Sequence, residues 1–119
     1  MAVADLAREA ARRYCATLPL PEWADALADA LGVPPAARVD AAMDELCVIL
    51  GRVLEDQAVQ HLTVAELAAL ARFYNTPEGL SVARKTLAFS AATRPVLEAE
   101  LIAWAQRVSA AAGGPATAP

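Results

Sequence analysis

Hydrophobic residues recur at three- and four-residue steps over most of this sequence, which is the spacing of amphipathic α-helices. The pattern predicts one helix over residues 2–17 and a shorter one from Pro21 to Leu31. Pro19 and Pro21 separate them, because proline cannot continue a helix interior. Gly32 follows the second helix as a suitable terminating residue. The apolar stripes consist of Val3, Leu6, Ala10, Tyr14 and Cys15 in the first helix, and Trp23, Leu27 and Leu31 in the second.

The longest uninterrupted pattern runs from about Pro35 to Gln60 and predicts a long third helix. Gly51 lies inside it and is less favourable there than alanine by about 1 kcal/mol. Two interpretations remain for Gly51: another helix approaches closely at this point, or the helix has a hinge. The stripe of this helix consists of Val39, Met43, Leu46, Cys47, Leu50, Val53 and Leu54.

The start of the next helix has the clearest local signal in the chain. Thr63 and Glu66 have the spacing of a capping box, in which each side chain bonds the backbone N–H of the other residue. Leu62 and Leu67 stand where a hydrophobic staple would close over that cap. The helix that follows is predicted to bury Leu67, Leu70, Ala71 and Tyr74, with Phe73 at the edge of this stripe.

A helix–turn–helix corner is predicted at Asn75–Gly79, where the sequence reads FYNTPEG. Asn75 is expected to end one helix in the left-handed conformation, and Thr76 to cap the next. Pro77 suits the first position of that helix, and Gly79 allows a close approach to a neighbour. Two aromatic residues that precede the turn are expected to pin the helices together: Phe73 and Tyr74.

The last helical segment runs from Thr76 to about Ala111 and carries two stripes. Pro95 lies between them and predicts a kink or a break near Ala92–Pro95. The whole pattern predicts an all-α fold, a single compact bundle of five to six helices over residues 1–111, with a flexible tail at 112–119. The stripes are Leu80, Ala83, Leu87 and Ala91, then Leu97, Leu101, Trp104 and Val108.

Composition and charge exclude some classes of partner. The chain is 57% hydrophobic, largely through alanine, and its formal net charge is −4. Nucleic-acid binding normally requires a basic patch, and the densest basic cluster, Arg8, Arg12 and Arg13 around Glu9, reads as a solvated helix face. Charged residues interrupt every apolar stretch, so no membrane span is predicted.

No catalytic, cofactor-binding or metal-binding constellation is predicted. His61 is the only histidine, and a metal site there would need carboxylates such as Asp56 or Glu66. Lys85 would be a reactive amine only if it were buried. These features favour a binding or structural module over an enzyme. Two carboxylate pairs at helical spacing read as exposed faces: Asp40 with Asp44, and Asp25 with Asp29.

Cys15 and Cys47 do not form a CxxC pair, so a redox or zinc motif is not indicated. They are either two small buried side chains on different helices or a disulfide formed in an oxidising compartment.

Two kinds of binding module fit the sequence. The first is a protein-interaction or structural domain, for example a homodimer, with Val82 and Phe89 as the partner face. These two residues are seven apart and lie off the Leu80–Leu87 stripe, although a helix buried on all sides would also place them so. The second is a carrier that holds a lipid or another small apolar ligand between its alanine-rich helices.

Residues from Leu62 to about Leu101 resemble the bacterial family called domain of unknown function 2059. The resemblance is carried by the spaced pattern EL..L..FY.TPEG, from Glu66 to Gly79, with Leu62 before it and Lys85 after it. It implies an all-α domain of an exported, often periplasmic protein, and no biochemical activity. The N-terminus lacks the apolar core of a signal peptide, so the protein is cytoplasmic or has lost a leader. The resemblance favours a lost leader and raises the expectation of a Cys15–Cys47 disulfide.

Overall fold

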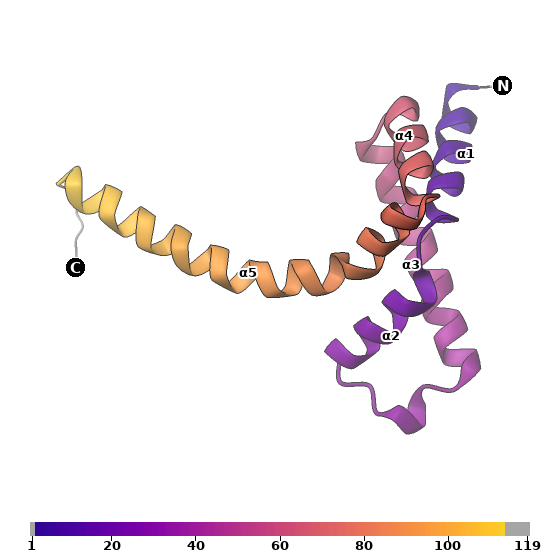
Figure 1. Cartoon of the computed structure of the whole chain (residues 1–119), viewed down its shortest axis with the longest axis horizontal. Helices are drawn as coiled ribbons and strands as arrows, with labels where there is room; N and C mark the ends of the chain where they lie inside the picture. Colours follow the sequence, from indigo (N-terminus) through magenta and orange to yellow (C-terminus); the bar gives the residue numbers. More distant parts are fainter. Residues whose placement is uncertain (1, 114–119) are drawn as a thin grey trace. The chain divides into compact units, whose positions relative to one another are not determined.

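The computed structural model describes residues 2–113, and its helices are labelled in Figure 1. These residues form five α-helices and one 3₁₀ turn and contain no strand, which confirms the predicted all-α fold. Contacts divide the chain into two units, residues 1–87 and 88–119, and each is described by itself. The elements are α1 (Val3–Cys15), α2 (Leu20–Ala30), η1 (Pro35–Ala37), α3 (Asp40–His61), α4 (Val64–Tyr74) and α5 (Pro77–Ala111).

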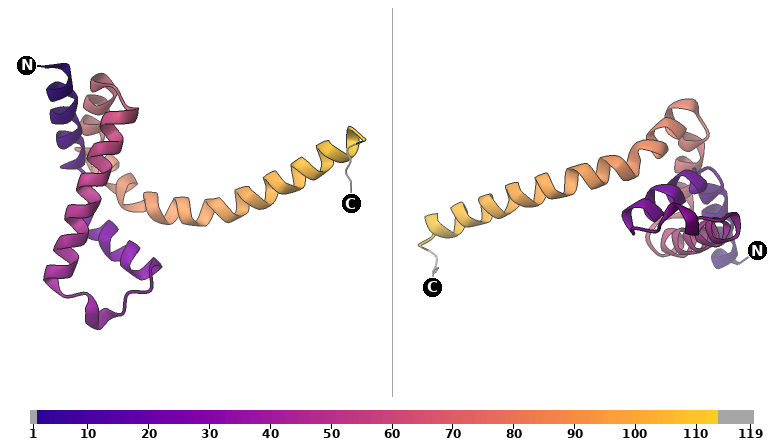
Figure 2. Two further views of the ribbon diagram at one scale, coloured as in Figure 1. Left: turned by 180° about the vertical axis from the view of Figure 1, so that it is seen from behind. Right: turned by 90° about the horizontal axis from the view of Figure 1, so that it is seen from below.

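The first unit is a helical bundle in which α1 packs against both α3 and α4, while α2 packs against α3 (Figures 1 and 2). The first turns of α5 are joined to α2: the Trp23 indole N–H donates to the Ala83 carbonyl at 2.9 Å. Arg84 and Glu22 form an ion pair between the same two helices at 3.0 Å. These contacts place residues 77–87 in the first unit.

Small side chains make up most of the core. Ala11 of α1, Ala58 of α3 and Leu67 of α4 meet in one buried cluster, against which Tyr14 and Leu62 pack. Alanine lets helix backbones approach closely, and this explains how a chain with few aromatic residues closes a core. Leu67 is the one large side chain of the described residues that is fully buried.

Several residues of the predicted apolar stripes in α1, α2 and α3 are exposed. Because α2 and α3 bury small residues such as Ala24, Ala28 and Ala58, their bulkier side chains lie at the rims of the contacts. In α1 the buried residues are Ala11 and Cys15, which both lie in the C-terminal half of the helix. The exposed stripe residues of these three helices are Val3, Leu6, Leu31, Val39 and Val53.

An ion-pair cluster joins α1 to α3. Arg8 donates to Asp56 at 2.6 Å and to Glu55 at 3.1 Å, and Arg12 lies 3.4 Å from Glu55. The two hydrogen bonds raise the pKa of the Arg8 guanidinium. Arg12 and Arg13 are exposed, as predicted for a solvated face, and Arg8 is partly exposed; the α3 carboxylates also match the charges of Arg8 and Arg12.

The end of α2 and the loop after it are fixed by local hydrogen bonds. Gly32 has a φ of +75°, and its N–H bonds the Asp29 carbonyl, while the Val33 N–H bonds the Ala28 carbonyl. This is a Schellman motif, so the prediction of a terminating glycine is confirmed. Arg38 bonds the Val33 carbonyl and pairs with Asp29 at 2.6 Å. The loop interrupts the long third helix that we predicted from Pro35: η1 covers its first turn, and α3 begins only at Asp40.

The capping box of α4 is confirmed. The Thr63 hydroxyl accepts from the Glu66 N–H at 3.1 Å, and the Glu66 carboxylate accepts from the Thr63 N–H at 2.8 Å. Leu62 packs against the core cluster that contains Leu67, as a hydrophobic staple requires.

Replacing Thr63 by alanine should lower the free energy of unfolding by about 1 kcal/mol. The Glu66 N–H would lose its hydrogen-bond acceptor, and the reciprocal bond from the Thr63 N–H to Glu66 would lose its support. Urea denaturation followed by circular dichroism measures this change. Thr86→Ala is the matched control: the Thr86 hydroxyl bonds the Val82 carbonyl inside α5, where alanine is the better helix former. Equal midpoints for the Thr63→Ala variant and the wild type would contradict a stabilising role for the box.

The last helix continues through its proline. We predicted a kink or a break near Ala92–Pro95, and the break was wrong, because α5 runs from Pro77 to Ala111 with Pro95 inside it. The carbonyl of Ala91 loses its intrahelical donor at this point, but Ala91 and Pro95 are both exposed. Water can therefore satisfy the freed group without ending the helix. The predicted tail at 112–119 lies outside the described residues from 114 onward.

Candidate functional site

The α4–α5 corner is built around one hydroxyl group. Thr76 donates its Oγ1 hydrogen to the Phe73 carbonyl at 2.6 Å and accepts from the Gly79 N–H at 3.0 Å. It therefore satisfies a carbonyl at the end of α4 and caps the start of α5, as predicted. These two hydrogen bonds fix the orientation of the hydroxyl at the corner.

Gly79 is the point of closest approach at the corner. It is buried, and a Cβ built on it would lie 2.5 Å from the Phe73 carbonyl carbon and 2.8 Å from the Tyr74 Cα. These are backbone atoms, which cannot rotate away as a side chain can. Only glycine fits this position without opening the turn.

Asn75 does not take the predicted left-handed conformation, since its φ is −89°. Its N–H bonds the Ala71 carbonyl at 3.1 Å, and the Thr76 N–H bonds the Phe73 carbonyl at 3.1 Å. The helix ends because Pro77 keeps the residue before it out of the helical region, and no left-handed residue is needed.

Two aromatic contacts surround the corner. The rings of Phe73 and Tyr74 lie 5.3 Å apart, and the Tyr74 ring lies 5.9 Å from the ring of Tyr14 on α1. Burial raises the pKa of the Tyr14 phenol, with smaller contributions from Tyr74 and Cys15. Phe73 remains 44% exposed, consistent with its predicted edge position. The corner thus has a structural explanation for Phe73, Tyr74, Thr76 and Gly79.

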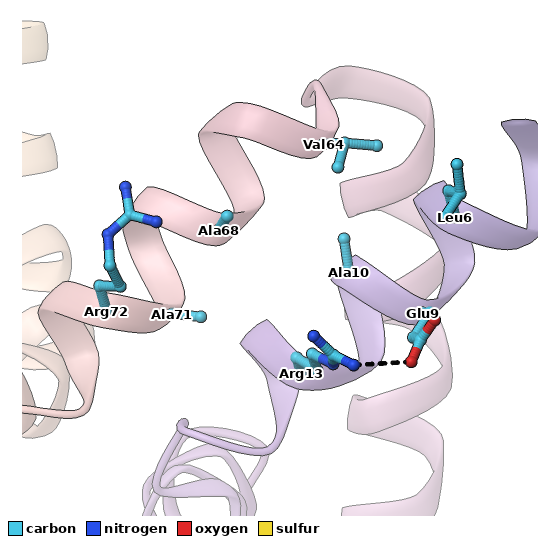
Figure 3. A pocket seen from close by; sticks show the side chains of 8 residues that line it. All are labelled: Leu6, Glu9, Ala10, Arg13, Val64, Ala68, Ala71 and Arg72. Atoms are coloured by element: carbon cyan, nitrogen blue, oxygen red, sulfur yellow. Dashed lines mark hydrogen bonds and ion pairs between the residues drawn. The ribbon is translucent and has the colours of Figure 1, made fainter.

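A groove between α1 and α4 is a candidate binding site of the first unit (Figure 3). It has a volume of about 360 Å³ and is open on one side. Arg13 lies at the groove but is paired with Glu9 at 2.8 Å. Arg72 forms no ion pair with the residues that the structure describes. The apolar lining comes from Leu6, Ala10, Val64, Ala68 and Ala71.

The residues considered for metal or acid–base chemistry do not come together. Exposed His61 lies 3.2 Å from Gln57, while its possible partners are engaged elsewhere, Asp56 with Arg8 and Glu66 in the capping box. Across residues 2–113, no group of three His, Cys, Asp or Glu side chains is placed to hold a metal ion. Lys85 is exposed, so it lacks the burial that a reactive amine would need.

Cys15 and Cys47 are both free thiols in the structure, so it does not contain the disulfide whose expectation the resemblance raised. Cys15 is buried in α1, whereas Cys47 is partly exposed on α3. Burial raises the pKa of the Cys15 thiol, and the nearby Glu55 carboxylate adds to this shift. Cys15 is therefore a poor nucleophile at neutral pH.

The two residues of the predicted partner face belong to different units. Val82 lies in the first unit and is 47% exposed, while Phe89 lies in the second and is 69% exposed. Whether either contacts a partner stays a prediction.

The described part of the second unit is one helical segment with exposed apolar residues along it. Its stripe of Leu97, Leu101, Trp104 and Val108 is 48–55% exposed. The sequence predicted the stripe correctly, but the pattern alone does not distinguish a stripe that meets the chain's own core from one that meets a partner. Other large apolar side chains of this unit are also exposed: Phe89, Val96 and Ile102.

Comparison with known proteins confirms the resemblance. Residues 59–110 match the family model described as an uncharacterized protein conserved in bacteria, domain of unknown function 2059. The matched segment begins in the last turn of α3, includes α4 and the corner, and reaches almost to the end of α5. No curated protein and no solved structure matches the chain. None of the described helices is long and apolar enough to cross a membrane.

Proposed function

We propose that this protein is an interaction module that self-associates through the second unit, residues 88–111 of α5. The observation that carries the proposal is the exposed stripe of Leu97, Leu101, Trp104 and Val108. A single helix cannot bury its own stripe, because its side chains point outward. A second apolar surface is therefore needed to remove this apolar area from water, and we propose that another copy of the chain supplies it.

The spacing of the stripe favours another helix as the partner. Its residues follow one another at steps of four, three and four, which is the heptad spacing of a coiled-coil seam. A second copy of the chain offers the same seam, so one surface can serve both partners in a two-fold dimer.

The expected affinity is modest. Each seam residue is about half exposed, so burying it contributes about 1 to 1.5 kcal/mol. The eight seam residues of a dimer then contribute about 8 to 12 kcal/mol, and association costs about 4 kcal/mol of this. The dimer should therefore depend on concentration, with a Kd between about 1 µM and 1 mM.

The test is sedimentation equilibrium of the wild type against two neighbouring substitutions. Leu101→Lys places a charge in the seam and should abolish the dimer. Ile102→Lys is the matched control. Ile102 is 59% exposed, and because it directly follows Leu101 along the helix, it lies off the seam. A monomeric wild type up to about 1 mM, the upper end of the expected range, or equal loss of dimer in both variants, would contradict the proposal.

The partner face predicted from Val82 and Phe89 gives a different expectation for the same measurement. If that face made the contact, Phe89→Lys would weaken the dimer more than Leu101→Lys. We favour the seam because it has four large apolar side chains within one unit.

The groove between α1 and α4 supports the second candidate function, a carrier of a small apolar ligand. Its volume of about 360 Å³ lies at the lower end of ligand pockets. Native mass spectrometry of the same samples separates the two candidates, because a carrier would appear as a monomer with a bound adduct. The exported, periplasmic location is also part of the proposal, and it is supported by the family resemblance alone. Purification from the periplasmic fraction of a bacterium with the natural leader tests it.

A further inference from the structure

We infer that the two α5 segments of the dimer run antiparallel and that Glu100 pairs with the partner's Arg107. This inference rests on the proposed self-association and specifies its geometry. The observations are the heptad register of the exposed seam and the positions of the two charges beside it.

The seam fixes the register of the helix. In heptad notation, Leu97 and Trp104 occupy d positions, while Leu101 and Val108 occupy a positions. In an antiparallel pair, an a residue faces a d residue of the other helix. Leu101 then faces the partner's Trp104, and Leu97 faces the partner's Val108. Each contact occurs twice by symmetry, and each pairs a larger side chain with a smaller one.

Charges beside the seam distinguish the two orientations. Glu100 and Arg107 both occupy g positions, and antiparallel helices bring g positions together. The antiparallel dimer therefore makes two symmetric Glu100–Arg107 pairs. Neither residue forms an ion pair with the residues described here. The residues three and four positions away from them on the same helix carry no charge: Val96, Leu97, Ala103, Trp104, Ala110 and Ala111.

A parallel pair lacks this complementarity. Parallel helices bring a g position to the following e position, so Glu100 would face the partner's Ala105, and Thr93 would face Glu98. No opposite charges would meet. A parallel seam would also stack Trp104 on Trp104, the largest side chain on itself.

The other charged residues of this segment are compatible with the antiparallel pair. Glu98 occupies an e position and faces the partner's Ala105, and Arg94 lies opposite the partner's Ala111 at the end of the seam. Neither therefore meets a like charge.

The test uses two charge reversals and their mixture, measured by sedimentation equilibrium. Glu100→Arg should raise the dimer Kd about tenfold or more, because both pairs become arginine facing arginine. Arg107→Glu should do the same through two facing glutamates. An equimolar mixture of the variants should recover dimers with a Kd near that of the wild type, because each heterodimer contains two opposite-charge pairs.

The outcomes separate this inference from the proposed function. If the wild type dimerises, Leu101→Lys abolishes the dimer, and neither charge reversal changes the Kd, then self-association stands and the antiparallel register is overturned. If the mixture is as monomeric as its components, the pairing is also overturned. A wild type that stays monomeric overturns the proposed function itself. Circular dichroism of each variant verifies that α5 remains helical.

Discussion

Replacing Gly79 by alanine is expected to lower the free energy of unfolding of the first unit by at least about 3 kcal/mol. The added methyl group would overlap the backbone of Phe73 and Tyr74. Relief requires the corner to open, which would also break the hydrogen bond from the Gly79 N–H to Thr76. The change therefore combines steric strain with the loss of a helix cap.

Gly51→Ala is the matched control, because it adds the same methyl group to another helical glycine. The nearest atom to a Cβ at Gly51 would be the Leu20 Cδ1, at an ordinary contact distance of 3.6 Å. Alanine is the better helix former, so this variant should be more stable by up to about 1 kcal/mol. The close approach predicted for Gly51 is thus a side-chain contact that leaves room for a methyl group.

Both variants are best measured in a Trp104→Lys background. This change removes the tryptophan of the second unit and charges the proposed seam, so the fluorescence of Trp23 reports on the first unit without a contribution from self-association. Urea midpoints that fall together for the two glycine variants would contradict the steric explanation of the corner. If Gly79→Ala fails to fold, circular dichroism still compares its helix content with that of Gly51→Ala and so tests the steric explanation.

Local signals in the sequence predicted the helix ends well. The Thr63–Glu66 box, the Thr76 cap and the terminating Gly32 all bond as their residue types require. Each depends on atoms within about four residues of one another, so the chemistry is visible in a short sequence window. The prediction failed at Asn75 because two local mechanisms can end a helix. We expected a left-handed residue, but the proline after Thr76 already ends this helix.

Predictions about burial were weaker, because burial depends on which helices meet. The pattern placed Val53 in the apolar stripe of α3, but it could not show that the core contact is made by Ala58, which lies five residues further on and therefore off that face. The groove between α1 and α4 was missed for the same reason. Its lining is contributed by two helices separated along the chain by α2 and α3. No signal within either segment indicates that they face each other.

The continuation of α5 through Pro95 connects the fold to the proposed function. We predicted one domain over residues 1–111, and this stays a prediction alongside the two units defined by contacts. The second unit carries its apolar residues on a continuous helix, which is the form that a coiled-coil partner requires. A break at Pro95 would have shortened that helix and left the seam of Leu97 to Val108 at a frayed end.

Replacing Leu67 by alanine is the second substitution with a large expected effect, a loss of about 3 kcal/mol in the free energy of unfolding. Leu67 is fully buried where α1, α3 and α4 meet, beside Ala11 and Ala58. Truncation removes its apolar area and leaves a cavity that neighbouring alanines are too small to fill. Since the surrounding side chains are short, collapse would require whole helices to move.

Leu31→Ala is the control for this substitution, because Leu31 is 75% exposed just after α2 and should change stability by less than about 0.5 kcal/mol. The same Trp23 fluorescence assay in the Trp104→Lys background measures both variants. A loss below about 1 kcal/mol for Leu67→Ala, well short of a core truncation, would mean that the three helices do not share this contact. The expected loss would instead show that one leucine and a few alanines hold together the unit to which the proposed self-association helix is attached.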